Sequence, residues 1–173
     1  YRNKLWSKLD ASNVMSGLMK YVDLCICNEE DANEVFNINA PDTDVTKGKI
    51  SKEGYKSVIN ELVARFGFKS VAITLRNSIS ASKNIWSAIY FTDNEFYYSK
   101  EYSIDIVDRI GGGDSFGAAL IFASLRKYSP QKRVDFSVAA SCLKQTIEGD
   151  YNLVSVEDVE NLMNGDTTGR IKR

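Results

Sequence analysis

Three consecutive glycines, Gly111, Gly112 and Gly113, stand where an extended segment gives way to a helical one. Ahead of them, residues 102–107 alternate polar and apolar side chains, as a half-buried strand does. Behind them, apolar side chains from Phe116 onward return at helical spacing. Glycine has no Cβ, so such a turn admits unusual backbone angles and the close approach of a ligand. The sequence therefore predicts a strand, a glycine turn and a helix whose first N–H groups form an anion site.

Asp114 follows the glycines directly, although its negative charge would repel a phosphate held by the same amides. The residue fits this place as a base aimed at a substrate hydroxyl, while the amides hold a phosphoryl group in transfer. The structural alternative is that Asp114 is an ordinary helix N-cap. Two familiar phosphate loops do not match. A Walker A loop needs Lys and Ser or Thr after its last glycine, and a dinucleotide fingerprint needs Gly at Phe116.

The composition narrows the class of protein. The 173 residues suffice for one domain with a hydrophobic core. The 22 basic and 23 acidic residues are interspersed, which argues against a nucleic-acid or membrane-surface partner. We see no apolar run long enough to span a membrane and no signal peptide, so a cytoplasmic protein is expected. The chain has no histidine, which excludes Ser-His-Asp and Cys-His catalysts and leaves acid–base work to carboxylates, Lys or Tyr.

The three cysteines are expected to be small buried thiols in a reducing cytosol. Cys25 and Cys27 lie two residues apart in a predicted strand, so both thiols should point to one face. Without histidine or a second cysteine pair, a zinc site is not expected.

Strands and helices alternate along the rest of the chain. Short apolar segments predict strands at 23–27 and 70–75, and a hairpin of 85–91 and 95–99 turns at Asp93-Asn94. Residues 76–84 are expected to form a turn. Helices are predicted from their first residues and apolar spacing: they begin after Ser7, Asn28, Ser51 and Ser155, and one begins at Pro130. The helix that begins at Pro130 is expected to reach about Ile147. This alternation predicts one three-layer α/β/α domain over residues 1–173, with a mostly parallel sheet.

The segment Asp108-Arg109-Ile110-Gly111-Gly112-Gly113-Asp114-Ser115-Phe116 resembles the C-terminal signature of the ribokinase-like carbohydrate kinases. The form with Arg109 and three glycines is most similar to that of 2-keto-3-deoxygluconate kinases. Further similar segments follow the family's order along the whole chain, at 1–6, 21–32, 71–76, 139–144, 149–153 and 169–170. The resemblance covers only the C-terminal part of the family's fold. The N-terminal strands and the lid, which carry most sugar contacts, are therefore expected to be lacking from this sequence.

The resemblance implies an enzyme that phosphorylates a sugar or sugar acid with ATP and Mg²⁺. Asp114 would be the catalytic base, and the amides of Gly111, Gly112, Gly113 and Asp114 would form the anion hole. The expected ATP-binding residues are Asn28, Thr74, Arg76, Ser80 and Val138. Arg2 and Asp150 would contact the sugar together with Asp114. Asp108 corresponds to a position that helps to hold a monovalent cation. Asp31, where the family usually has Glu, corresponds to one that organises Mg²⁺ through water.

Several of these residues also have a plainer interpretation. Asn28 could cap the helix that follows it, and Asp150 could be an acid in a polar turn. Arg76 stands where the family has Gly and could simply be solvated, and Val138 could serve helix packing alone. At the level of function, the alternative to an active kinase is a non-catalytic fragment that binds nucleotide weakly or only self-associates. Relatives often pair through the lid, so a homo-oligomer is a further expectation.

Overall fold

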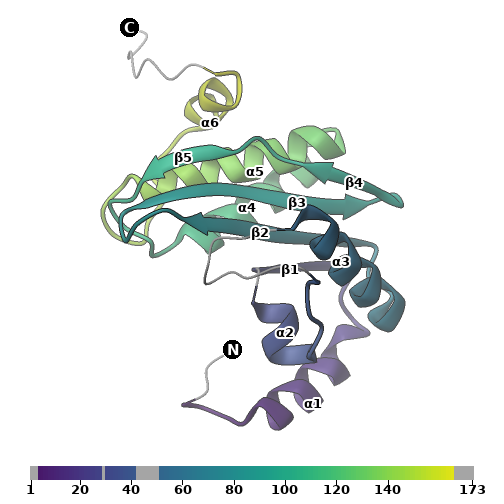
Figure 1. The fold of residues 1–173 in the computed structure, drawn as a ribbon. Helices are drawn as coiled ribbons and strands as arrows, with labels where there is room; N and C mark the ends of the chain where they lie inside the picture. The colour runs from purple at the N-terminus through teal and green to yellow at the C-terminus, as the bar shows by residue number, and fades with distance from the viewer. Residues whose placement is uncertain (1–3, 29, 42–50, 166–173) are drawn as a thin grey trace, which may run out of the picture. The chain divides into compact units, whose positions relative to one another are not determined.

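A computed structural model describes residues 4–28, 30–41 and 51–165 (Figure 1). Helices and strands alternate in the first half of the chain, and helices dominate its end. Their bounds are α1 Lys8–Met19, β1 Leu24–Asn28, α2 Asp31–Phe36, α3 Lys52–Phe66, β2 Ser70–Ser78, β3 Lys83–Thr92, β4 Glu95–Tyr98, β5 Tyr102–Asp105, α4 Gly112–Leu125, α5 Pro130–Gln145 and α6 Val156–Met163.

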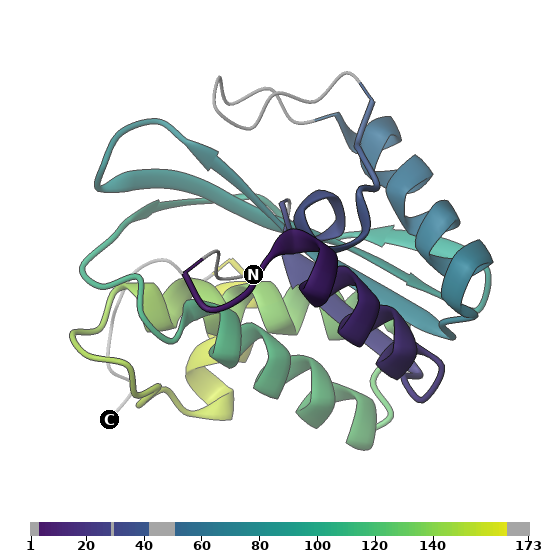
Figure 2. The same ribbon diagram turned by 90° about the horizontal axis from the view of Figure 1, so that it is seen from below.

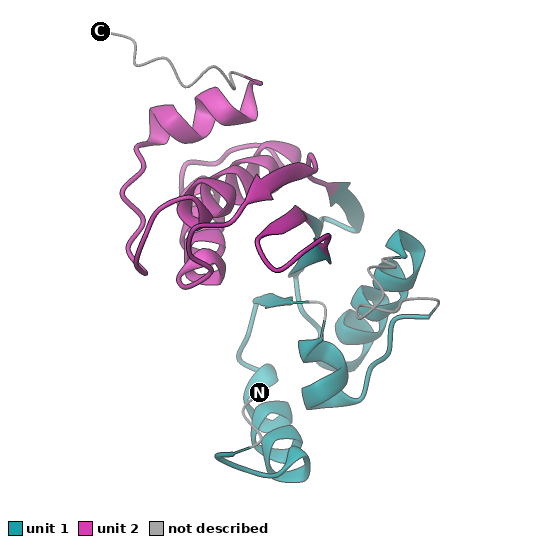
Figure 3. Cartoon of the chain, turned by 60° about the vertical axis from the view of Figure 1, so that its left-hand side comes forward, with its two compact units in different colours: residues 1–77, 88–97 teal, residues 78–87, 98–173 magenta. Residues whose placement is uncertain are grey.

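The residues group into two compact units (Figure 3). Unit 1 consists of residues 1–77 and 88–97, and unit 2 of residues 78–87 and 98–173. Strand β3 therefore contributes one half to each unit. The sequence predicts a single domain over the same length.

In unit 1, the strands are neighbours in the order β1-β2-β3-β4. β1 pairs with β2 in parallel, with Leu24 opposite Ser70 and Asn28 opposite Thr74. The predicted caps of α3 are confirmed. Ser51 accepts a hydrogen bond from the Gly54 N–H at 3.0 Å, and Gly67 ends the helix in the left-handed conformation. One face of α3 is buried through Tyr55, Val58, Ile59 and Leu62, so the helix is held by its apolar face.

In unit 2, β5 pairs with β3 antiparallel, with Lys83 opposite Asp105 and Trp86 opposite Tyr102. Helices α4 and α5 lie side by side (Figure 2), and α6 packs against α5. Small side chains form much of the core between these helices: Ala119, Ala123, Ala139 and Ala140, with Phe136 and Val159. Because alanines keep side chains short, the two helix backbones can approach closely, and this contact fixes the start of α4 on α5.

The sheet differs from the prediction in direction and in two boundaries. The sequence predicts a mostly parallel sheet, but the strands joined by the tight turn at Asp93-Asn94 and the β3–β5 pair make the described sheet mixed. Both turn residues adopt left-handed angles, as a two-residue hairpin requires. β2 continues to Ser78, so the turn predicted at 76–84 is shorter. β5 ends at Asp105 because the N–H groups of Val107 and Asp108 donate to the Gln145 carbonyl, at 2.9 and 3.2 Å.

The cysteines are free thiols, and their burial differs. Cys142 is buried and Cys25 and Cys27 are half-buried, although the sequence predicts burial for all three. Burial raises the pKa of the Cys142 thiol. Among the helices described, none combines the length and the apolar character needed to cross a membrane.

Candidate functional site

The glycine turn forms the start of α4. Gly111 is the N-cap and adopts φ 79°, in the left-handed region. A Cβ at this position would overlap with the main-chain carbonyl oxygen of Asp150. A Cβ at Gly113, in contrast, would meet no atom within 4 Å. The turn therefore requires glycine at position 111 and is open at position 113.

The amides of this turn remain available for a ligand. The first helical hydrogen bond runs from the Ser115 N–H to the Gly111 carbonyl at 2.8 Å, and the Gly112 N–H reaches Arg109 O at a long 3.3 Å. Within the described residues, no acceptor meets the N–H groups of Gly113 and Asp114. Two unbonded N–H groups at the positive end of a 14-residue helix are the features that an anion site requires.

Asp114 is the third residue of α4 and is exposed. The helix has no side-chain cap, so the interpretation of Asp114 as an ordinary N-cap is wrong. Its carboxylate accepts no hydrogen bond from the residues that the structure describes. An acceptor without an internal partner, on the residue whose own N–H is one of the two unbonded amides, has the position that a base beside an anion hole requires.

The Asp108 carboxylate accepts hydrogen bonds from two turns, the glycine turn and the turn that follows α5. Its Oδ1 accepts the Ile110 N–H and its Oδ2 accepts the Gly149 N–H, both at 3.0 Å. The hydrogen bond from Ile110 is the largest cause that lowers the pKa of this carboxyl. The Gly149 bond and the positive charge of Lys144 lower it further, against some desolvation. Asp108 therefore holds the glycine turn against the turn that follows α5.

Hydrogen bonds join the last turns of α5 to the glycine turn and the start of α4. Ser141 Oγ donates to the Gly112 carbonyl at 2.8 Å, and Ser115 Oγ donates to the Ala140 carbonyl at 3.2 Å. The amide of Asn152 donates to Ser115 Oγ at 2.6 Å. None of these three residues has a role that the sequence predicts. The one available signal was a serine at a buried helix position in both α4 and α5.

Three further predicted residues also lie in unit 2. The main chain of Asp150 lies against Gly111, while the residue as a whole is exposed. Ser80 Oγ accepts the N–H groups of Ser82 and Lys83, at 3.3 and 3.0 Å, and so organises the turn between β2 and β3. Val138 lies on α5 and is fully buried. This burial fits the plainer interpretation, in which Val138 serves helix packing.

In unit 1, Asn28 and Asp31 bind one another's main chain. Asn28 Oδ1 accepts the N–H groups of Glu30 and Asp31, at 2.8 and 3.0 Å, and Asp31 Oδ2 accepts the Asn28 N–H at 2.9 Å. Asn28 therefore accepts two N–H groups at the entry to α2, but the N-cap of this helix is Glu30, so the interpretation of Asn28 as the cap is wrong. Thr74 is buried opposite Asn28 in the sheet, and Arg76 is half-buried on β2. Arg2 lies outside the described residues.

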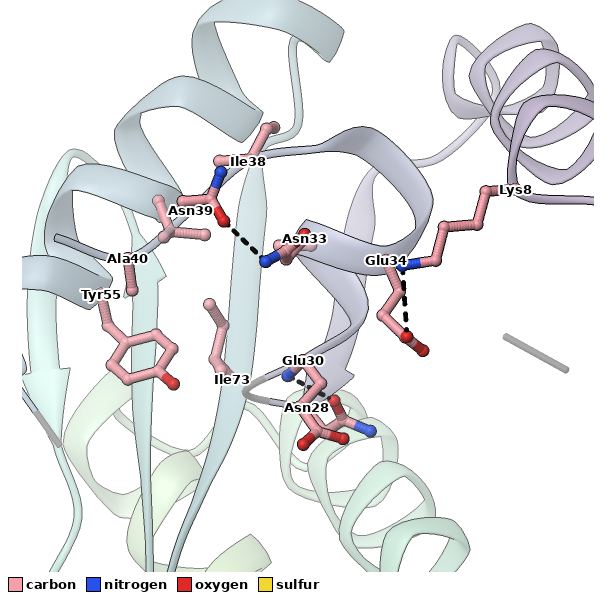
Figure 4. Close-up of a pocket in the computed structure, with 12 residues that line it drawn as sticks. Lys8, Asn28, Glu30, Asn33, Glu34, Ile38, Asn39, Ala40, Tyr55 and Ile73 are labelled. Atoms are coloured by element: carbon pink, nitrogen blue, oxygen red, sulfur yellow. Dashed lines mark hydrogen bonds and ion pairs between the residues drawn. The ribbon is translucent and has the colours of Figure 1, made fainter. Parts of the chain in front are cut away.

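A cavity of about 310 Å³ lies beside Asn28 (Figure 4). Asn28 and Glu30 line one part of it, and Tyr55 and Ile73 another. Lys8 and Glu34 form an ion pair of 3.5 Å at its border. The described residues contain no group of three or more His, Cys, Asp or Glu side chains that could hold a metal ion. The predicted residues thus fall into two groups, Asn28, Asp31, Thr74 and Arg76 in unit 1, and the glycine turn with Asp108, Asp114 and Asp150 in unit 2.

Sequence relatives and solved structures were compared with this chain. The 2-dehydro-3-deoxygalactonokinase of Haloferax volcanii is 25% identical over 169 residues, which are 98% of this chain and 46% of that protein. The crystal structure of 2-dehydro-3-deoxygluconokinase from Thermotoga maritima is 44% identical, with a TM-score of 0.88, over 95% of this chain and 48% of that one. The chain thus spans about half the length of these relatives.

Two structures from Escherichia coli share the fold and hold ligands. One, assigned as a ribokinase II, is in complex with ATP and Mg²⁺, at 17% identity and a TM-score of 0.68, over 91% of this chain and 45% of that one. The other is phosphofructokinase-2 in complex with potassium, at 16% identity and a TM-score of 0.65, over 87% of this chain and 43% of that one. The ribokinase-like fold predicted from the sequence is confirmed by these similarities.

The resemblance seen in the Asp108–Phe116 segment is confirmed by a match over most of the chain. Residues 1–156 match the pattern described as pfkB family carbohydrate kinase. This match includes the glycine turn, Asp114 and the supporting end of α5. The chain belongs to the pfkB family of carbohydrate kinases.

Proposed function

We propose that this chain carries the phosphoryl-transfer site of an ATP-dependent sugar-acid kinase, with 2-keto-3-deoxygluconate as the substrate. The observation that carries the proposal is the pair of unbonded amides at Gly113 and Asp114, directly beside the exposed Asp114 carboxylate. Membership of a carbohydrate kinase family and the similarity to a 2-dehydro-3-deoxygluconokinase support the reaction and the substrate class.

Asp114 accepts the proton from the attacking sugar hydroxyl. The hydroxyl oxygen then forms a bond to the γ-phosphorus, and the bond between that phosphorus and the oxygen bridging to the β-phosphate breaks, which leaves ADP. The N–H groups of the glycine turn stabilise the charge on the phosphoryl oxygens during transfer. Such a reaction depends mainly on positioning and charge compensation, so a site without histidine is sufficient.

The other predicted residues have supporting roles in the proposal. Asn28, Thr74, Arg76 and Ser80 contact ATP, and Arg2 and Asp150 contact the sugar acid. Since the described residues offer no metal-binding cluster, Mg²⁺ would be carried mainly by phosphate oxygens and water, with Asp31 at most in the outer shell. The metal would neutralise phosphate charge.

The chain's length relative to its relatives keeps a second function open. The chain spans 46–48% of those relatives, so it could bind nucleotide without turnover. ADP formation should be assayed with 2-keto-3-deoxygluconate, 2-keto-3-deoxygalactonate, fructose and ribose, beside calorimetric titration of ATP–Mg. Turnover with either sugar acid supports the kinase, and nucleotide binding without turnover supports the second function. If neither is found, both are wrong.

A further inference from the structure

Lys144 is a lysine with no exposed surface at all, 0% of its side chain area, near the end of α5. Its Nζ donates to the Ile147 carbonyl at 3.2 Å, three residues further along the chain. A buried ammonium is strongly unfavourable unless nearby groups compensate its charge. The position of this lysine therefore calls for a physical explanation.

The side chain of Lys144 lies directly behind the glycine turn. Its Cε would be 3.2 Å from a Cβ placed on Gly111, which is the N-cap of α4. The positive charge of Lys144 also helps to lower the pKa of the Asp108 carboxyl, so the two charges lie close enough to interact. The buried Lys144 side chain thus lies against the glycine turn, and its charge acts on Asp108, which accepts hydrogen bonds from this turn and from Gly149.

The resemblance implies a monovalent cation beside Asp108, and the residues present do not fit one. Each Asp108 oxygen already accepts a main-chain N–H, from Ile110 and from Gly149. A cation at the same carboxylate would also meet the repulsion of the ammonium of Lys144, a residue that is itself fully buried.

We propose that Lys144 is a positioning residue of the anion hole, whose ammonium supplies from within the chain the positive charge that a monovalent cation would otherwise bring behind Gly111. The link to phosphoryl transfer rests on the proposed function. We therefore expect phosphoryl transfer that needs no added K⁺, because the Lys144 ammonium, which is part of α5, provides the positive charge.

The unmodified chain gives the first test. Its thermal unfolding midpoint and its dissociation constant for pyrophosphate should be measured in KCl and in N-methylglucamine chloride at equal ionic strength. We expect the same midpoint and a dissociation constant that changes less than about twofold. A saturable increase in either stability or pyrophosphate affinity that only K⁺ produces would overturn the proposal.

Lys144→Met gives the second test, because it keeps the length of the side chain and removes its charge. We expect pyrophosphate to bind about tenfold more weakly in N-methylglucamine chloride, and K⁺ to restore part of the loss. The matched control is Lys132→Met, on the same helix but paired with Glu160 at the surface, which should bind pyrophosphate as the wild type does. A Lys144→Met variant with unchanged affinity, or a loss that K⁺ fails to restore, would overturn the proposal.

The two proposals fail in different ways. If the wild type does not bind pyrophosphate, the anion hole of the proposed function is wrong. The unfolding midpoints then still decide about Lys144, because only a charge replacement predicts K⁺-independent stability in the wild type and K⁺-dependent stability in Lys144→Met. If Lys144→Met does not fold, the wild-type comparison of the two salts decides alone.

Discussion

The main-chain carbonyl oxygen of Asp150 occupies the space that a side chain at Gly111 would need. The N-cap of α4 and the turn after α5 are thereby in direct contact, and the hydrogen bond from the Gly149 N–H to Asp108 strengthens the same contact. The glycine turn is consequently part of a three-segment structure, together with the end of α5 and residues 149–150.

Gly111→Ala should destabilise the protein. The left-handed angle alone costs an L-residue about 1–2 kcal/mol, and the overlap with Asp150 adds to this. Urea unfolding would measure the loss in unfolding free energy. Gly113→Ala is the matched control, because its Cβ enters open space, and it should be neutral or raise helix stability by up to ~1 kcal/mol. Equal effects of the two substitutions would contradict the geometry of the turn.

Asp114→Asn should lower stability by no more than about 1 kcal/mol, the size of a carboxylate's interaction with a helix N-terminus, and reduce turnover. The carboxylate has no hydrogen-bond partner among the described residues, so its loss removes no internal contact. Removing a general base typically lowers the rate by ~10²–10⁴-fold. The measurement is kcat of the wild type and the variant at saturating sugar acid. The control variant is Asp105→Asn, which removes an exposed acid from β5. A variant at position 114 with full turnover would refute the role of Asp114 as the base.

Asp108→Asn should change how stability depends on acid. The pKa of Asp108 lies below its ordinary value of 3.8 in the folded protein, so its stabilisation is present above that value and is lost as pH falls through the folded pKa. The difference in unfolding free energy between wild type and variant should therefore be largest near neutral pH and shrink in acid. Denaturant unfolding at several pH values from about 7 to 3 would measure this. A difference that is constant over the range would contradict the assignment.

Tyr102→Phe should be neutral or stabilising. The Tyr102 hydroxyl is buried without a hydrogen-bond partner in the described structure, and desolvation is the largest cause that raises its pKa to about 12. Removing an unsatisfied buried hydroxyl relieves a desolvation penalty. The control is Tyr128→Phe, which loses a hydrogen bond of 3.2 Å to Glu160 and should be the less stable variant. Thermal unfolding of both variants at pH 7 would compare them, and a larger loss for Tyr102→Phe would contradict this account.

Local sequence signals predicted the local structure well. The caps at Ser7, Ser51 and Ser155 were predicted because each satisfies an N–H three residues away, and the structure has all three. The hairpin at Asp93-Asn94 was also predicted from a local signal, because both residues tolerate the left-handed angles that its turn requires. The motif that begins at Asp108 predicted the family, which the match over residues 1–156 confirms.

The support of the site could not be predicted in the same way. Ser115 and Ser141 bond to main-chain carbonyls that are 25 and 29 residues away, and such partners leave no pattern in the sequence. The burial of Lys144 likewise depends on how α4 packs on α5. The alternation of strands and helices predicts a mostly parallel sheet. The sheet is mixed because short turns precede and follow β3, and strands joined by a short turn run antiparallel.

Position 150 contributes its backbone to the glycine turn and leaves its side chain exposed. A carbonyl group is common to all amino acids, so the fit to Gly111 does not depend on which residue stands there. The side chain at position 150 can therefore be exchanged, in nature or by design, while the glycine turn next to it keeps its shape.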